Sequence, residues 1–385
     1  MFRHKTLFSK HLFIPKKMLT MNRSQIMALQ FAIITFLSLP FLSCSSDDET
    51  TGYTPDFSYQ MDASNPNLVT FTNTSSGEYL YTEWDFGNGE TTSKETAKDK
   101  EYTIYYPLKG EYEVQLKVWG PVNTTNDIKI ISKTVTIEAD DSEYDLNGTL
   151  VWSDEFDGSN INSSNWTFET GANGWGNNEL QNYTNGSNAH IEDGKLVITA
   201  RKENDNTTAG SYSSTRMISW GKQEFKYGRI EVRAKLPSGR GIWPAIWMLG
   251  ANLGSAGWPA CGEIDIMEYV GYEPDVVHAT VHTTAGSGVN GNGSSKRLTT
   301  CEEQFHIYGL TWTEEKMEFY IDTPDNITHT YSPASKTAAN WPFDKPQFFI
   351  LNIAVGGNWG GAQGVDNTIF PQTMEVDYVR VYELD

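Results

Sequence analysis

The sequence predicts an all-β protein that contains two antiparallel sandwiches, a small one followed by a large one. From residue 55 onward, short segments rich in β-branched and aromatic residues alternate apolar with polar positions, as half-buried strands do. Clusters of Gly, Asn and Ser separate these segments and indicate turns. No stretch of the large block sustains the 3.6-residue period of an amphipathic helix over three turns.

Composition and charge limit the classes of function. The 385 residues are 38% apolar and 13% aromatic, which suffices to bury a core and argues against wholesale disorder. The 49 acidic and 29 basic side chains give a formal net charge of −20. This charge argues against nucleic-acid binding, because phosphate backbones need Lys and Arg. It also disfavours sulfated or uronic polymers and leaves neutral ones open. We expect a monomer.

The first 43 residues predict a secretory signal. They hold six basic residues and no acid, and their apolar run, 26–43, is short and contains Pro40, unlike a membrane-spanning helix. Residues 41–44, Phe-Leu-Ser-Cys, resemble a bacterial lipoprotein signal, although Leu is usual where Phe41 stands. This resemblance, with the acidic residues 47–49, implies a lipid anchor at Cys44 on the bacterial outer membrane, facing the cell surface. An ordinary cleaved signal peptide is the alternative.

The small sandwich carries a recognisable turn. Trp-Asp-Phe-Gly-Asn-Gly at 84–89 is followed about twenty residues later by Tyr-Tyr-Pro-Leu-Lys-Gly-Glu-Tyr-Glu-Val at 105–114. This pair resembles the polycystic-kidney-disease (PKD) type of immunoglobulin-like domain, with Asn88 where Asp is usual. The resemblance implies a spacer, with glycan binding as the alternative. We divide the chain into a signal (1–43), a tether (44–54), the PKD-like domain (55–138), an acidic linker (139–147) and a large sandwich (148–385).

One strand of the large sandwich concentrates acidic side chains. In residues 263–268, Glu-Ile-Asp-Ile-Met-Glu, alternation places Glu263 and Asp265 on one face and the isoleucines on the other. Strict alternation would send Glu268 to the apolar face. We predict a β-bulge at residues 266–267, because one extra residue restores Glu268 to the acidic face.

Three carboxylates on one strand favour catalysis. Neighbouring like charges repel and raise at least one pKa. Retaining glycosidases use such a pair, with one carboxylate as nucleophile and one protonated acid about 5–5.5 Å away. A calcium site or a solvated acidic edge strand are the alternatives, although a calcium site would more naturally use a loop.

Tryptophans precede the acidic strand. Four of them fall within the 44 residues before Glu263: Trp220, Trp243, Trp247 and Trp258. Indole faces stack on the apolar faces of pyranose rings, although core packing is the commoner role of any single Trp. We expect Ile242 and Ile246 in the core and at least two of the tryptophans in a substrate cleft. Cys261 and Cys301 either form a disulfide, which secretion permits, or remain buried thiols.

Residues 148–385 resemble the laminarinase branch of the family-16 glycoside hydrolases. Five patterns in the right order carry the resemblance: Trp-Ser-Asp-Glu-Phe (152–156), Gly-Trp-Gly-Asn-Asn-Glu-Leu-Gln (174–181), Trp-Pro-Ala-Ile-Trp-Met-Leu (243–249), Glu-Ile-Asp-Ile-Met-Glu (263–268) and Val-Asp-Tyr-Val-Arg-Val-Tyr (376–382). The resemblance implies a concanavalin-like β-jelly roll, a cleft on its concave face and endo-hydrolysis of a neutral β-glucan with retained configuration.

The resemblance also implies residue roles, with no cofactor for catalysis. Glu263 would be the nucleophile, Asp265 its partner and Glu268 the general acid/base. The six-residue form with Met267 goes mostly with β-1,3-glucanases, so we expect laminarin-type or mixed-linkage β-1,3(1,4)-glucan as substrate. Glycan-contacting positions would be Asn177, Arg216, Trp243, Trp247 and Trp258.

Further positions are His282, Trp359 and a metal site. Alternation points His282 inward beside the catalytic strand, with a satisfied core imidazole as the alternative, and Trp359 lies in a Gly-rich loop that could rim the cleft. The family often holds a structural Ca²⁺, and the matching positions are Glu155, Gly194 and Asp377, together with backbone carbonyls.

Three rival functions differ in class or substrate. A glycan-binding lipoprotein without catalysis would have a broken triplet of acids, whereas all three are present. A purely adhesive β-protein would not need tryptophans around an acidic strand. Activity on agar or carrageenan is disfavoured by the negative charge and by the tryptophan-rich segment. The sequence leaves open pure β-1,3-glucan against mixed-linkage glucan.

Overall fold

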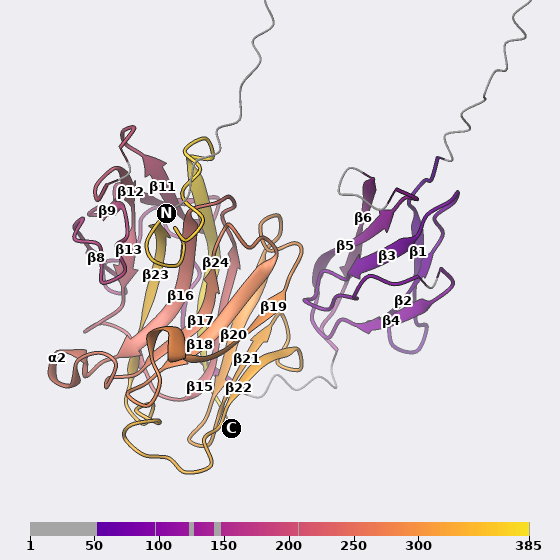
Figure 1. Cartoon of the computed structure of the whole chain (residues 1–385). Helices are drawn as coiled ribbons and strands as arrows, with labels where there is room; N and C mark the ends of the chain where they lie inside the picture. Colours follow the sequence, from indigo (N-terminus) through magenta and orange to yellow (C-terminus); the bar gives the residue numbers. More distant parts are fainter. Residues whose placement is uncertain (1–51, 97, 123–126, 142–147, 207, 385) are drawn as a thin grey trace, which may run out of the picture. The chain divides into compact units, whose positions relative to one another are not determined.

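The computed structural model describes residues 52–384 except 97, 123–126, 142–147 and 207. The predicted signal, Cys44 and most of the tether and the linker lie outside the described residues. Almost all regular structure in the described part is strand, as Figure 1 shows. The exceptions are a short helix and a 3-10 turn: α2 (Leu253–Ala256) and η1 (Gly288–Asn290). Within these residues, no helix has the length and apolar character to span a membrane.

The small domain is a sandwich of two three-stranded antiparallel sheets, in the orders β1-β2-β4 and β3-β5-β6. Its strands are β1 (Phe57–Met61), β2 (Leu68–Asn73), β3 (Tyr81–Asp85), β4 (Glu101–Tyr105), β5 (Gly110–Trp119) and β6 (Ile128–Ile137). Trp84 and Phe86 stack at 5.6 Å in the core between the sheets, against Phe71. This aromatic core is what the alternation in the sequence predicts, and it confirms the immunoglobulin-like sandwich.

The large domain packs two larger sheets face to face. The first sheet contains β22 (Ile327–Tyr331), β21 (Met317–Ile321), β20 (His306–Trp312), β15 (Gly228–Lys235), β24 (Gln372–Glu383), β11 (Lys195–Lys202), β12 (Tyr212–Ser214) and β9 (Gln181–Tyr183), with β10 (Ala189–Glu192) on β11 and β7 (Thr149–Asp154) on β24. The second contains β19 (Asn292–Arg297), β18 (Val276–His282), β17 (Glu263–Tyr269), β16 (Ile242–Gly250), β23 (Gln347–Val355), β13 (Arg216–Ile218) and β8 (Thr167–Glu169), with β14 (Glu224–Phe225) on β23.

The core of the large domain lies between these sheets. Ile242 and Ile246 are fully buried in it, as predicted. Strand β23 is buried along its whole length, which explains its nearly unbroken apolar sequence. The second sheet turns its other face away from this core, and that face carries the polar residues described below.

The two cysteines of the large domain are buried free thiols. Cys301 belongs to the main core, whereas Cys261 packs with Ile218, Leu249 and Phe348 in a smaller cluster. Of the two alternatives that the sequence left open, the structure therefore contains the thiols and not the disulfide.

Candidate active site

The acidic strand has the predicted bulge. Along β16, Ile246 pairs with Met267 and the next residue, Trp247, pairs with Asp265, so Ile266 has no partner. The register with β18 shifts in the same place, between Asp265 and Glu268. Ile266 and Met267 both pack in the core, and Glu268 returns to the face that carries Glu263 and Asp265. The surplus residue therefore brings all three acids to one face.

Two side chains hold the first acid of this strand. Trp258 donates from Nε1 to Glu263 Oε2 at 2.8 Å, and the residue is half exposed. His282 on β18 places Nε2 3.6 Å from Glu263 Oε1 and 3.2 Å from Asp265 Oδ2. The inward orientation of His282 is confirmed, and it is not a core imidazole. Glu263, Asp265 and His282 have donor atoms within 4.8 Å of one another. Among the described residues, they form the only group of His, Cys, Asp and Glu close enough to share a metal ion.

The last acid of the strand has a separate set of neighbours. Trp243 donates from Nε1 to Glu268 Oε1 at 3.0 Å. The ring of Trp359 lies edge-on to Trp243 at 5.5 Å and to His278 at 5.0 Å, and His278 is the cross-strand partner of Glu268. Glu268 is thus held by a tryptophan and remains partly exposed.

Burial dominates the electrostatics of the three carboxyl groups. It raises the pKa of Asp265 and of Glu268 to about 8, and that of Glu263 well above its usual range. The Asp265 charge raises the pKa of both glutamates further, whereas His282 and the indole N–H groups act in the opposite direction. The three carboxyl groups therefore do not all ionise together at neutral pH, so that one of them can stay protonated as an acid while another carries the negative charge.

Beside the acids, aromatic rings enclose an arginine. The guanidinium of Arg216 lies 4.7 Å from the ring centre of Trp247 and 5.0 Å from that of Trp175, and its Nε donates to Glu169 Oε2 at 2.5 Å. Trp247 itself donates to Asn352 Oδ1 at 2.7 Å. These contacts fix two of the predicted glycan-contacting side chains in defined orientations.

Polar residues in β9 and just before it form a second hydrogen-bonded cluster. Asn177 donates to Glu179 Oε1 at 3.2 Å, and Gln181 donates to Glu179 Oε2 at 2.6 Å. Glu179 is buried, and burial raises its pKa. Tyr183 joins this cluster to β23 through Asn352, whose Nδ2 donates to Tyr183 Oη at 3.1 Å.

The family model of the glycosyl hydrolases family 16 matches residues 176–380, and the PKD domain model matches residues 56–132. The chain belongs to glycosyl hydrolase family 16. A β-glucanase of Rhodothermus marinus is 48% identical over 245 residues, which cover 60% of this chain and 84% of that protein. The crystal structure of a laminarinase from Flavobacterium sp. UMI-01 superposes with a TM-score of 0.58 and 50% identity, over 61% of this chain and all of that one.

Another relative in the family has a different substrate in its name. A keratan-sulfate endo-1,4-β-galactosidase of Sphingobacterium multivorum is 37% identical over 245 residues, covering 61% of this chain and 55% of that protein. Membership of family 16 therefore settles that the chain is a glycoside hydrolase and leaves the glycan to further argument.

Four residues of this family-16 site were not singled out as site residues from the sequence. Glu179 lies inside one of the recognised patterns, and His278 shares the alternation of His282, so a signal for both existed. Trp175 also lies in that pattern, but its contact with Arg216 is made across the fold. Asn352 lies in an apolar strand without any local motif, and only the pairing of β23 with β16 brings it to Trp247.

The predicted calcium positions have other partners. Arg380 holds both carboxylate oxygens of Glu155, at 2.9 and 2.8 Å. Asp377 accepts from Arg233 at 2.7 Å, and Gly194 lies beside Asp157. Glu155 and Asp377 thus each have an arginine partner in this structure, and the calcium ion stays a prediction. A calcium ion there would depend on backbone carbonyls.

Proposed function

We propose that this glycoside hydrolase cleaves β-1,3- or mixed-linkage β-1,3(1,4)-glucan internally and with retained configuration. One observation carries the proposal: Glu263 and Glu268 lie on the same face of one strand, each receiving a hydrogen bond from a tryptophan. The names of the Rhodothermus and Flavobacterium relatives support a β-glucan as substrate.

The first half of the reaction uses both glutamates. Glu263, ionised, attacks the anomeric carbon and forms an ester bond, while the glycosidic C–O bond breaks. Glu268, protonated, donates its proton to the departing oxygen. Its raised pKa of about 8 keeps that proton in place at neutral pH. His282 contacts both Glu263 and Asp265, and this pair helps to orient the Glu263 carboxylate.

The second half reverses these roles. Glu268, now ionised, takes a proton from water as the water oxygen attacks the anomeric carbon. The ester bond breaks and Glu263 leaves as a carboxylate. Two successive inversions at one carbon give net retention.

The nucleophile can be tested directly. Glu263→Ser removes the attacking oxygen, and we expect hydrolysis of laminarin to be abolished while oligosaccharide binding stays measurable by calorimetry. Glu315→Ser, at an exposed turn, is the matched control and should retain activity. A Glu263→Ser enzyme that keeps a tenth of the wild-type rate would refute the assignment.

The glycan is decided by product analysis. Laminarin, barley β-glucan, agarose and xyloglucan are each digested, and NMR follows the anomer first released. We expect products from the first two only, with β-configuration first. Cleavage of agarose instead would select the galactan alternative.

The structural calcium ion stays a proposal of its own. We propose that backbone carbonyls around Gly194 bind it, since the nearby carboxylates have arginine partners. Thermal unfolding in calcium and in a chelator tests this. A higher melting temperature in calcium would support the ion, and identical temperatures would exclude a stabilising one.

The lipid anchor and the cellular location are likewise proposed from the sequence. Cys44 and its acidic neighbours support lipidation and display on the bacterial outer membrane. Labelling cells with a fatty-acid analogue should mark the wild type and not Cys44→Ala, which should be released in soluble form. We also propose a monomer, which light scattering of that released form would check.

A further inference from the structure

The small domain buries polar side chains on a face where solvent is expected. In β3, Trp84 points into the aromatic core, so alternation directs Glu83 and Asp85 to the outer face. That face of an isolated sandwich is solvated. Nevertheless Glu83 is 5% and Asp85 3% exposed, and Gln115, opposite Asp85 on β5, is 5% exposed. We call these three residues the docking face.

A segment of the family-16 domain covers the docking face. Arg297 Nη1 lies 2.9 Å from Glu83 Oε1. Glu303 accepts a hydrogen bond from Gln115 Nε2 at 3.1 Å. We call residues 297–306 the docking segment. Buried carboxylates are costly unless they are paired. Arg297 of this segment is a nearer cation for Glu83 than Lys117 of β5, which lies 3.9 Å away.

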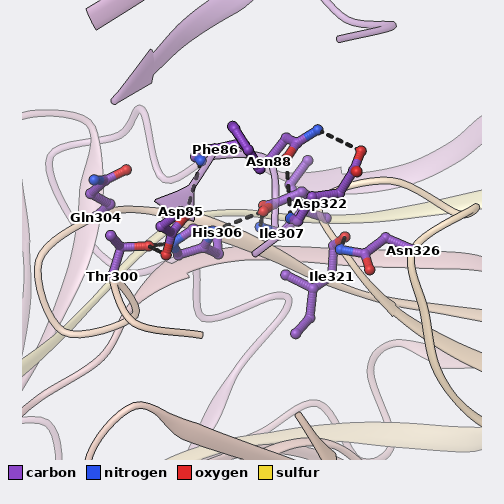
Figure 2. Close-up of polar contacts among 12 residues, drawn as sticks. Asp85, Phe86, Asn88, Thr300, Gln304, His306, Ile307, Ile321, Asp322 and Asn326 are labelled. Carbon is purple, nitrogen blue, oxygen red and sulfur yellow. Dashed lines mark hydrogen bonds and ion pairs between the residues drawn. The ribbon is translucent and has the colours of Figure 1, made fainter. Parts of the chain in front are cut away.

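Asp85 is joined to the docking segment by a buried chain of hydrogen bonds (Figure 2). Thr300 Oγ1 donates to Asp85 Oδ2 at 3.2 Å and lies 2.9 Å from His306 Nε2. His306 Nδ1 lies 2.8 Å from Asp322 Oδ2. A hydroxyl has one proton, so Thr300 can donate to Asp85 only if His306 donates to Thr300.

This series of hydrogen bonds therefore requires that both ring nitrogens of His306 carry a proton. With its other N–H directed at Asp322, His306 then carries a positive charge between two acids. Burial opposes this charge, but Asp322 and Asp85 outweigh it and raise the pKa of His306. Thr299 adds a second donor to Asp85 at 2.5 Å. Docking thus matches acids of the small domain with cationic and hydroxyl groups of the large one.

The turn after β3 also lies close to the catalytic domain, at a second place outside the docking segment. Gly89 has a φ of +80°, and a Cβ there would stand 2.4 Å from Asn326 Nδ2 and 2.8 Å from Ile321 Cγ2. Both neighbours belong to the end of β21 and the turn that follows it. Only glycine permits this backbone conformation at so close an approach.

We propose that the outer face of β3 and β5 is a docking surface for residues 297–306 of the catalytic domain. The PKD domain then acts as a fixed brace and not as a mobile spacer. The docking segment supplies the contacts of Glu83, Asp85 and Gln115 within the same chain.

The docking segment also contacts the strand that carries the three acids. Glu302, inside the docking segment, accepts a hydrogen bond from Tyr269, the residue directly after Glu268. Arg297 additionally lies 3.3 Å from Asp275, just before β18. Docking therefore restrains the end of β17 that holds the proposed acid.

Hydrogen exchange of the full chain tests the brace, because it reports on each domain separately. Amides of Glu303 and Gln304 donate to the Thr300 carbonyl, at 2.9 and 2.8 Å, and should exchange slowly in the wild type. Glu83→Arg, in the small domain, places a second cation against Arg297. We expect exchange of residues 299–304 to become several-fold faster, although the substitution lies in the other domain.

The matched control makes the same charge change elsewhere on the small domain. Glu101→Arg, on the exposed side of β4, should leave the exchange of residues 299–304 at the wild-type rate. Arg297→Glu disturbs the same pair from the catalytic side and should speed exchange of β3. Wild-type exchange of residues 299–304 in Glu83→Arg would overturn the proposal, whether or not the small domain stays folded.

Discussion

Every glutamate of the acidic strand is contacted by an indole N–H: Trp258 donates to Glu263 and Trp243 to Glu268. Such a donor favours the ionised carboxylate, whereas burial favours the protonated one. Because burial dominates, the pKa of each acid is raised. The cluster is therefore prepared to hold a transferable proton at neutral pH.

A pH prediction follows from this arrangement. The acid Glu268 must be protonated to donate, and its pKa is about 8, so kcat/KM should fall as pH rises through about 8. The profile of wild type and Glu268→Gln on laminarin is the measurement. In the variant, residual activity should lack this alkaline decline. A decline centred near the ordinary carboxyl pKa would contradict the role of burial.

The arginine between two indoles allows a second prediction. Lysine at position 216 keeps the charge but loses the planar group that stacks between Trp175 and Trp247 and bonds Glu169. We expect Arg216→Lys to raise KM roughly tenfold with little change in kcat, because stacking and orientation contribute about 1–2 kcal/mol. Steady-state kinetics on laminarin provide the test, with exposed Arg201→Lys as control. An equal fall in kcat would instead place Arg216 in the chemical step.

At the scale of the element, one surplus residue decides whether β17 is a catalytic strand. Ile264 and Met267 face the core on either side of the irregularity, and both are fully buried. A regular strand would place Glu268 on their side. The bulge thus satisfies the core and the active site with one sequence.

Removing the surplus residue, Ile266, should therefore disrupt both the packing of the core and the active site. Deletion of Ile266 forces either Glu268 or the apolar residues to the wrong face, which should cost at least about 3 kcal/mol of unfolding free energy and abolish hydrolysis. Ile266→Val keeps the register and should cost about 0.5–1.5 kcal/mol with activity retained. Urea unfolding and laminarin assays compare the two. An active, stable deletion variant would show that the bulge is dispensable.

At the scale of the molecule, the net charge of −20 bears on the substrate. A neutral glucan has no charge to be repelled, so laminarin hydrolysis should change little with ionic strength. Any hydrolysis of a sulfated galactan should rise with added salt as repulsion is screened. Initial rates over a salt series measure both. Faster cleavage of the sulfated polymer at low salt would mean that local cleft charges outweigh the net charge.

The fold and the acidic face were predictable because their signals are local. Period-2 alternation marks strands, and Glu263, Asp265 and Glu268 stand within six residues of one another. Residues such as Asn352 have no local signal, since their role depends on which strands pair. The arginine partners of Glu155 and Asp377 had no local signal either, because Arg380 and Arg233 reach these carboxylates from neighbouring strands.

The two sandwiches, the family and the strand that carries the acids follow from the amino-acid sequence alone, because each leaves its signal in local patterns of residues. The protonation of those acids, the enclosure of Arg216 and the burial of Asp85 against Thr300 follow instead from how the chain packs. These depend on desolvation and on contacts between distant segments, and neither exists until the sheets have packed.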